Sequence, residues 1–183
     1  MSPHSTGLLR DSPPINTGGR PKHPKTGFRS HAVGVGGRKV LLPQAVEVPN
    51  LMEEYLERVA RQRDALRNIT DGFDRIHKGL QIACDAHTTF VHIHPFGDGN
   101  GRLARLLSGV ILQDVGLPAP MFTRSQRHAY MNAVSKATID TNYMEVCSMH
   151  TAAVVRSARA ILSIAAGETI LHEYCNANDW CTR

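Results

Sequence analysis

A histidine, a proline and three closely spaced glycines stand at the middle of the chain, which reads HPFGDGNGR over residues 94–102. Because proline disfavours the α conformation of the residue before it, a helix that arrives here should end at about Ile93 and leave His94 free to project. The three glycines permit backbone conformations that let main-chain N–H groups gather around an anion. This stretch therefore predicts a loop between two helices that suits a phosphate group.

A second helix should begin directly after the glycines, because apolar residues recur there at helical spacing: Leu103, Leu106, Leu107, Val110 and Ile111. Its first turn adds unpaired N–H groups and a partial positive charge at the end of the loop. Arg102 and Arg105 share one face of that turn and can donate paired hydrogen bonds to phosphate oxygens. Asp98 is the only acidic residue of the loop, and its hard oxygen ligands suit Mg²⁺ that bridges phosphates.

Residues 94–105 resemble the signature of the Fic family, His-x-Phe-x-Asp/Glu-Gly-Asn-Gly-Arg-x-x-Arg, at every fixed position. The resemblance implies an all-α Fic fold, a helical bundle with a small β-hairpin flap over the active site. It also implies a protein adenylyltransferase, which moves AMP from ATP to a Ser, Thr or Tyr hydroxyl of a target protein. Family members often modify themselves as well, so the chain itself is an expected target.

The resemblance implies a role for each residue of the signature. His94 would act as the general base, since an ordinary histidine pKa of about 6.5 permits this at neutral pH. Asp98 would hold Mg²⁺, and Phe96 would plug into the core as a structural residue. The remaining residues would bind ATP: the backbone of Gly99, Asn100 and Gly101 and the Asn100 side chain around the phosphates, Arg102 at the outer phosphates, and Arg105 at the nucleotide or at an inhibitory carboxylate.

Two positions distinguish reactions within the family. A lysine in place of Gly101 marks the Doc-type kinase, and a phosphocholine-transferring branch departs from the signature at Gly99. This chain keeps glycine at both positions, so the resemblance favours nucleotidyl transfer. Use of another nucleotide, removal of AMP by the same site, and a nucleotide-binding module without transfer stay open as alternatives.

A metal-dependent hydrolase is a less favoured alternative from another class. Its ligands would come from the cysteine, histidines and aspartate of this region: Cys84, His87, His92, His94 and Asp98. Cys84 and His87 lie one turn apart, but His92 falls off their helical face and Pro95 redirects His94. A common tetrahedral site is therefore disfavoured, and a core or supporting hydrogen bond is the expected role of His87.

Residues 28–42 predict a β-hairpin, because two short β-branched runs flank a pair of glycines. Gly27-Phe28-Arg29 resembles the sequence that leads into the Fic flap, so the flap is assigned to residues 28–45. Its edge would pair with an extended target segment through Val35, Gly36, Gly37 and Val40. The alternative is a hairpin that only covers the core.

The rest of the domain, taken as residues 28–168, should be helical. Pro49 and Asn50 begin one helix, and a second, capped near Thr70 or Asp71, runs to the loop. The helix of residues 103–115 is apolar on several sides, which predicts full burial. Two more helices are expected at about residues 123–137 and 141–166.

The two ends of the chain differ from this core. Residues 1–27 are rich in proline, glycine and basic residues, which predicts a disordered tail and a Fic core with little room for earlier helices. Residues 169–183 form a C-terminal segment in which Thr169 and Glu173 partly match the family's inhibitory helix. Glu173 would pair with Arg105 and hold the enzyme off, unless it is simply an exposed carboxylate. A separate antitoxin-like helix is the other expected restraint.

The charge and the cysteine content of the sequence limit which partners and which cellular compartment are expected. The net charge of +5 arises mostly from residues 1–30, and no nucleic-acid motif accompanies it, so neither nucleic acid nor membrane is an expected partner. The four cysteines, Cys84, Cys147, Cys175 and Cys181, include no C-x-x-C pair. We therefore expect reduced thiols and a cytoplasmic protein, or one delivered into a host cytoplasm, although Cys175 and Cys181 could pair.

Overall fold

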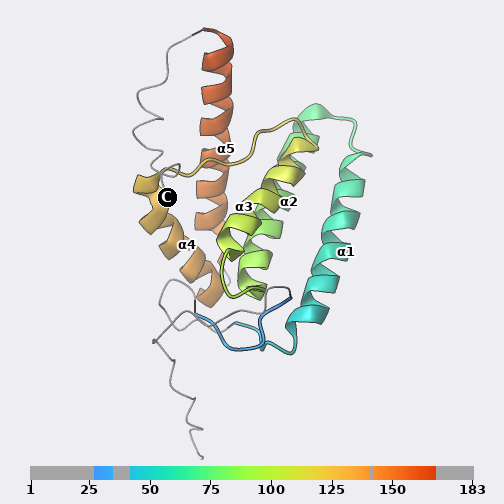
Figure 1. The fold of residues 1–183 in the computed structure, drawn as a ribbon. Coiled ribbons are helices and arrows are strands. Elements are labelled where there is room, and N and C mark those ends of the chain that lie inside the picture. The colour runs from blue at the N-terminus through green and yellow to red at the C-terminus, as the bar shows by residue number, and fades with distance from the viewer. Residues whose placement is uncertain (1–26, 35–41, 141, 168–183) are drawn as a thin grey trace, which may run out of the picture.

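The computed structural model describes residues 27–34, 42–140 and 142–167, and these form a helical bundle (Figure 1). Its elements follow one another along the chain as α1 Val48–Leu66, α2 Gly72–Ile93, α3 Asn100–Gln113, the 3₁₀ turn η1 Arg124–Gln126, α4 Arg127–Asp140 and α5 Met144–Ala165. No strand occurs within the described ranges, so the all-α prediction is confirmed. None of the described helices is long and apolar enough to cross a bilayer.

The predicted hairpin cannot be followed as a whole. Its central residues 35–41, which include Val35, Gly36, Gly37 and Val40, lie outside the described residues. On either side, residues 28–34 and 42–44 have irregular backbone. The flap and its target-docking edge therefore stay a prediction.

Helix α2 is the central element, with α1 on one side of the α2 and α3 pair and α4 and α5 on the other (Figure 1). Asp71, one of the two residues expected to cap it, is its N-cap, and the Asp71 carboxylate accepts a hydrogen bond of 2.8 Å from the Asp74 N–H. Small buried residues let its neighbours approach closely; a Cβ built at Gly79 would lie 2.7 Å from the Val115 side chain. The long side chains of the core, such as Phe90, then fill the space between the helices.

Charged and polar contacts join the C-terminal ends of α1 and α3 to the N-terminal part of α2. The Arg63 guanidinium forms a forked pair with the Asp114 carboxylate, with N···O distances of 2.6 and 3.0 Å. Arg75 of α2 donates to the Asp114 carbonyl at 2.7 Å. Arg63 holds the pKa of Asp114 below its usual range, so the carboxylate stays charged at neutral pH.

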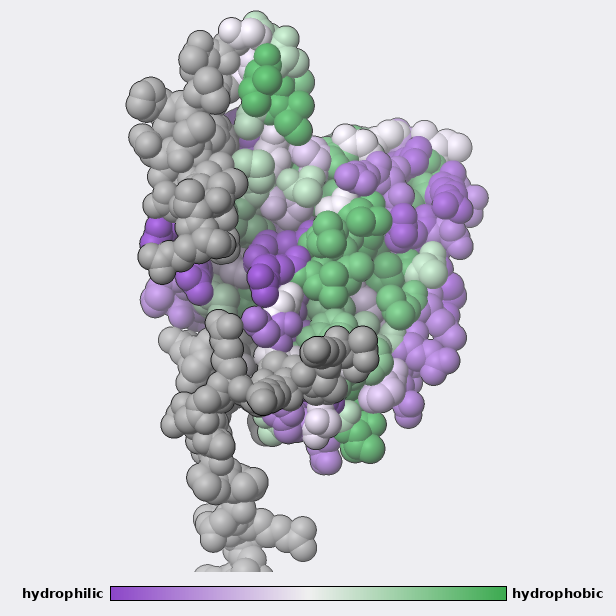
Figure 2. Space-filling view, viewed as in Figure 1, coloured by the Kyte–Doolittle hydropathy of each residue, from purple (hydrophilic) through white to green (hydrophobic). Residues whose placement is uncertain are grey.

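The prediction that the helix after the glycines is fully buried is wrong. Ala104, Ile111 and Leu112 face the core, but Leu106 is 63% exposed and Val110 is 38% exposed. Hydrophobic side chains gather on this outer face over α3 (Figure 2). The reason is geometric: α3 packs on α2 along one face only, and no described element covers the other.

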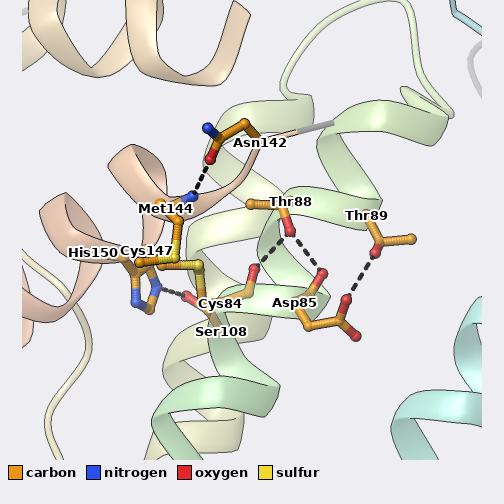
Figure 3. Close-up of a disulfide and its surroundings, with 9 residues drawn as sticks. All are labelled: Cys84, Asp85, Thr88, Thr89, Ser108, Asn142, Met144, Cys147 and His150. Atoms are coloured by element: carbon orange, nitrogen blue, oxygen red, sulfur yellow. Dashed lines mark hydrogen bonds between the residues drawn. A yellow bond between two sulfur atoms is a disulfide. The ribbon is translucent and has the colours of Figure 1, made fainter. Parts of the chain in front are cut away.

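The expectation of reduced thiols is also wrong for two of the four cysteines. Cys84 of α2 and Cys147 of α5 form a disulfide, with their Cα atoms 5.6 Å apart (Figure 3). Disulfides persist in oxidising environments, so the step from free thiols to a cytosol no longer holds. The sequence could not show this pair, because 63 residues separate the two cysteines and only the packing of α5 on α2 joins them. Cys175 and Cys181 lie outside the described residues.

Candidate active site

The site begins where α2 ends. The helix stops at Ile93, as Pro95 predicts, and His94 turns into the left-handed region with φ 50° and ψ 57°. Among the described residues it is the only one other than glycine with a positive φ. Its N–H still donates to the Phe90 carbonyl at 3.0 Å. A left-handed histidine before proline costs roughly 1–3 kcal/mol, so the contacts around it must hold it there.

The His94 ring has one defined protonation pattern. Its Nδ1 lies 3.1 Å from the Val91 carbonyl oxygen, which can only accept, so Nδ1 carries the hydrogen. The lone pair is therefore on Nε2. Burial lowers the pKa of His94, the Val91 hydrogen bond raises it, and the positive charge of Arg29 lowers it further, with a net fall. The ring is neutral at pH 7 and can accept a proton.

The loop after His94 is closed by an asparagine. The Asn100 Oδ1 accepts from the Phe96 N–H at 2.9 Å, and the Asn100 Nδ2 donates to the Phe96 carbonyl at 2.6 Å. Asn100 is only 2% exposed, and its side chain holds the loop through these two bonds. The phosphate contact that the resemblance implied for this side chain stays a prediction. The Phe96 ring packs against Phe28 and Phe90, at centroid distances of 5.8 and 6.3 Å.

The N-terminus of α3 is open toward the loop. Gly99 is the N-cap residue, with φ 83°, a conformation that side-chain-bearing residues rarely adopt, and no side chain caps the helix. The first helical bond is donated by Leu103 to the Gly99 carbonyl at 2.9 Å. The preceding N–H groups of Asn100, Gly101 and Arg102 therefore have no partner within the helix. Three such groups at the positive end of a helix dipole suit an anion such as phosphate.

Asp98 and Arg102 stand at the mouth of this anion site. The Asp98 Oδ1 accepts from the Gly99 N–H at 2.6 Å, and its Oδ2 lies 3.5 Å from the Arg102 guanidinium. Both side chains are mostly exposed, and such an ion pair is worth less than about 1 kcal/mol. A phosphate for Arg102 and a cation for Asp98 can therefore replace this contact at little cost.

Arg105 is turned toward α4. Its guanidinium carbon lies 5.8 Å from the centre of the Tyr130 ring. The Tyr130 ring in turn packs at a tilt against Phe122, with centroids 4.6 Å apart, and its hydroxyl is hydrogen-bonded to the His87 Nε2. Burial raises the pKa of Tyr130, so its hydroxyl stays protonated. His87 thus makes the supporting hydrogen bond that was expected for it. Arg105 packs against α4 through the Tyr130 ring.

The residues of the rival metal site are not brought together as one ligand set. Cys84 is bonded to Cys147, and the His87 Nε2 is bonded to Tyr130. No group of three or more His, Cys, Asp or Glu side chains within the described ranges is arranged to hold a metal ion. A cation at Asp98 would therefore take its other ligands from the nucleotide phosphates and water.

A second buried histidine lies behind the site, and sequence reasoning missed it. The Nε2 of His150, on α5, is hydrogen-bonded to Ser108 of α3 at 3.0 Å (Figure 3). The Ser108 hydroxyl donates to the Arg105 carbonyl at 3.0 Å. The His87 and His150 rings lie 5.6 Å apart, and both residues are 0% exposed. Burial lowers the pKa of His87 to about 3 and that of His150 to about 4. Both rings are neutral in the folded protein.

The two buried histidines should make the protein acid-sensitive. Below pH 6.5 the unfolded chain binds a proton at each histidine and the folded chain does not, so stability falls as pH falls toward the folded pKa values of about 3 and about 4. We expect a loss of about 1.4 kcal/mol per pH unit for each histidine that stays neutral. Urea unfolding between pH 7.5 and 5 measures this slope. His150→Gln should flatten it, whereas loss of the exposed His77 by His77→Gln should not.

Comparison with known proteins identifies the family. A family model described as "Fic/DOC family" matches residues 4–112, more than half of the chain. The chain belongs to the Fic/DOC family. The match begins at residue 4, inside the stretch for which the sequence predicted a tail, and residues 4–26 lie outside the described residues.

Curated relatives of this Fic chain share a short region with it. A "Protein adenylyltransferase Fic" of Aedes aegypti is 41% identical over 58 residues, which is 32% of this chain and 12% of that protein. The protein of the same name from Drosophila melanogaster is 44% identical over 58 residues, again 32% of this chain and 12% of that protein. The chain therefore matches only about an eighth of their length.

Solved structures confirm the all-α Fic fold. A Fic domain containing signaling protein from Bacteroides thetaiotaomicron VPI-5482 superposes with a TM-score of 0.63 at 21% identity, over 78% of this chain and 56% of that one. A Fic family protein from Desulfovibrio desulfuricans G20 gives a TM-score of 0.51 at 27% identity, over 75% and 42% of the two chains. At such identities the likeness concerns the fold.

Not every residue singled out in the sequence is found at the Fic site. The structure gathers His94, Asp98, the glycines, Arg102 and Arg105 around one loop. Glu173, the inhibitory candidate, lies outside the described residues, as do the flap residues. One residue with many contacts to the loop was not assigned a role: Arg29, which the resemblance marked only as part of the sequence leading into the flap.

Proposed function

We propose that this Fic domain transfers AMP from ATP to a Ser, Thr or Tyr hydroxyl of a protein, itself included. The observation that carries the proposal is the pairing of a neutral His94, whose Nε2 lone pair is available, with the open N-terminus of α3 on the same loop. Transfer from a nucleotide to a hydroxyl needs a base close to an anion site, and here only five residues, 95–99, separate His94 from the start of α3. The relatives named protein adenylyltransferase support the same reaction.

The transfer step uses few protein groups. The His94 Nε2 takes the proton of the target hydroxyl, whose oxygen forms a bond to the α-phosphorus while the bond to pyrophosphate breaks. The electron pair of that bond leaves with pyrophosphate. The N–H groups of Asn100, Gly101 and Arg102 face the phosphate oxygens, and the Arg102 guanidinium offsets the charge on the outer phosphates. In this reaction the protein mainly positions the groups and stabilises charge.

Mg²⁺ fits the loop through one residue. Asp98 presents an exposed carboxylate whose side-chain contacts are the Gly99 N–H and a 3.5 Å contact with Arg102, so an oxygen is open to a hard cation. When bound, Mg²⁺ would neutralise phosphate charge and favour departure of pyrophosphate. Asp98 would hold it, and Arg102 would be released to the phosphates.

A labelling experiment tests the reaction class. The chain is incubated with Mg²⁺ and either α-³²P-ATP or γ-³²P-ATP, and the mass of the intact protein is measured after incubation with unlabelled ATP. AMP transfer predicts label from α-³²P-ATP only and a mass gain equal to AMP. Label from γ-³²P-ATP alone would identify a kinase. No label on the chain or on any protein of a cell extract would contradict transfer and leave a nucleotide-binding module.

Asp98→Ala should weaken productive binding of ATP with Mg²⁺ and lower AMP labelling by at least about tenfold, because it removes the only acidic ligand of the loop. Excess EDTA should abolish AMP labelling by the wild type. Asp64→Ala is the matched control, since the exposed Asp64 carboxylate of α1 pairs at the surface with Arg67, at 2.9 Å, and belongs to a different element from the loop. Labelling that persists in EDTA would show that the metal assignment is wrong.

A further inference from the structure

Arg29 is buried beside the end of α2, with only 4% of its surface exposed. Its Nε donates to the His94 carbonyl at 2.8 Å, and one terminal nitrogen lies 3.4 Å from the Ile93 carbonyl. Its backbone N–H donates to the Pro95 carbonyl at 2.8 Å. One residue thus binds three successive carbonyls around the candidate base.

The hydrogen bonds of the Arg29 side chain within the described part of the chain all end on backbone carbonyls. Besides Ile93 and His94, they reach His31 at 3.2 Å and Pro43 at 2.5 Å. A buried cation is unfavourable unless it is hydrogen-bonded, and here the carbonyls supply the compensation. His31 and Pro43 both lie within residues 28–45, the segment predicted to form the flap, one before and one after its residues 35–41. Arg29 therefore binds both described parts of that segment to the end of α2.

The position of this charge affects the ring of His94. The last carbonyls of a helix have no intrahelical partner and form the negative end of the helix dipole, which favours a protonated histidine. The Arg29 guanidinium lies on these carbonyls and offsets their charge. The charged groups of the loop and of the first turn of α3, Asp98 and Arg102, pair with each other, and Arg105 faces Tyr130.

We propose that Arg29 is a positioning residue of this active site. Its guanidinium holds His94 in the left-handed conformation, keeps the imidazole in the form with its lone pair on Nε2, and anchors His31 and Pro43 of the predicted flap segment to the same point. The inference rests on the proposed function, in which His94 is the base. It assigns no contact between Arg29 and ATP or the target.

The kinetic test compares Arg29→Lys and Arg29→Gln with wild type, and Arg58→Gln is the matched control. Arg58 is also an arginine with a side-chain bond across helices, to Thr89 at 3.0 Å, but it lies on α1 and contacts α2. We expect kcat for AMP transfer to fall by about 10- to 100-fold in both Arg29 variants, with KM for ATP changed less than about threefold. Lysine should not substitute, because it lacks the planar fork. Guanidinium ion at millimolar concentration should partly restore Arg29→Ala.

A second experiment does not depend on activity: NMR of the protein labelled with ¹⁵N-histidine reports the protonation state of the His94 ring. Wild type should show the hydrogen on Nδ1 and a pKa below the ordinary range, because burial and Arg29 both lower it. In Arg29→Gln the two neutral forms should mix and the pKa should rise. The groups of the loop and of α3 are the same in both proteins, so the change is due to Arg29.

The outcomes separate the two proposals. Wild type that transfers no AMP, together with the expected change in the His94 spectrum, would overturn the proposed function and leave the positioning role standing. An unchanged His94 spectrum and unchanged kcat in both variants would overturn the positioning role. Loss of the folded state in Arg29→Lys and Arg29→Gln alike, seen by circular dichroism, would also overturn it, because Arg29 would then serve the stability of the whole fold.

Discussion

His94→Ala should lower the rate of AMP transfer by about 10²- to 10⁴-fold, the usual contribution of a general base. The affinity for ATP should stay within a few-fold, because the ring acts on the target hydroxyl and its other nitrogen is bound to the Val91 carbonyl. Single-turnover labelling with α-³²P-ATP measures the rate, and equilibrium binding of an uncleavable ATP analogue measures the affinity.

Two controls give this result its meaning. His77→Ala removes an exposed histidine from α2, which leaves the loop intact, and should label like wild type. His94→Asn tests geometry, because an amide can keep one hydrogen bond of the ring but cannot act as a base at neutral pH. If His94→Ala labels at the wild-type rate, His94 has no part in the chemistry.

The pH dependence of transfer follows from the same ring. The base must be neutral, and its pKa is lowered from the ordinary 6.5, first by burial. The rate should therefore be highest at neutral and mildly alkaline pH, and its fall, as the ring gains its proton, should be centred below pH 6.5. A fall centred above pH 6.5 would show that the helix dipole prevails over burial and Arg29.

Local rules predicted the parts of the site that lie close together in the sequence. Pro95 predicted the end of α2 at Ile93, and the glycines predicted an open helix start directly after them; α3 begins at Asn100, three residues before the expected Leu103. Each conclusion depends on the allowed conformations of a few neighbouring residues. The resemblance then supplied expected roles for those residues.

Contacts between distant residues could not be predicted in this way. Arg29 lies 65 residues from His94, and no periodicity indicates that it binds the end of α2. The resemblance placed the Asn100 side chain at the phosphates, and only the folded loop shows that both its polar atoms also bond the backbone of Phe96. The exposed face of α3 likewise depends on which helices pack against it.

The same limit explains why the disulfide was missed, and its removal should have a large effect on stability. Cys84 and Cys147 close a loop with a sequence separation of 63, for which the chain-entropy estimate is about 4 kcal/mol. The bond joins α5 to α2 next to His150, which holds Ser108 of α3. Loss of the bond should therefore loosen α5 first.

Cys84→Ala combined with Cys147→Ala should lower the free energy of unfolding by about 4 kcal/mol, because the unfolded chain regains the freedom that the bond removes. Urea unfolding of the oxidised wild type, the reduced wild type and the double variant measures this. The reduced wild type and the double variant should have the same free energy of unfolding. In both of these proteins, hydrogen exchange should be faster in α5 than in α2. Transfer activity should persist where the variant is folded, since His94 and the anion site lie on the loop between α2 and α3. Equal stability of the oxidised and reduced wild type would mean that the bond contributes nothing to the folded state.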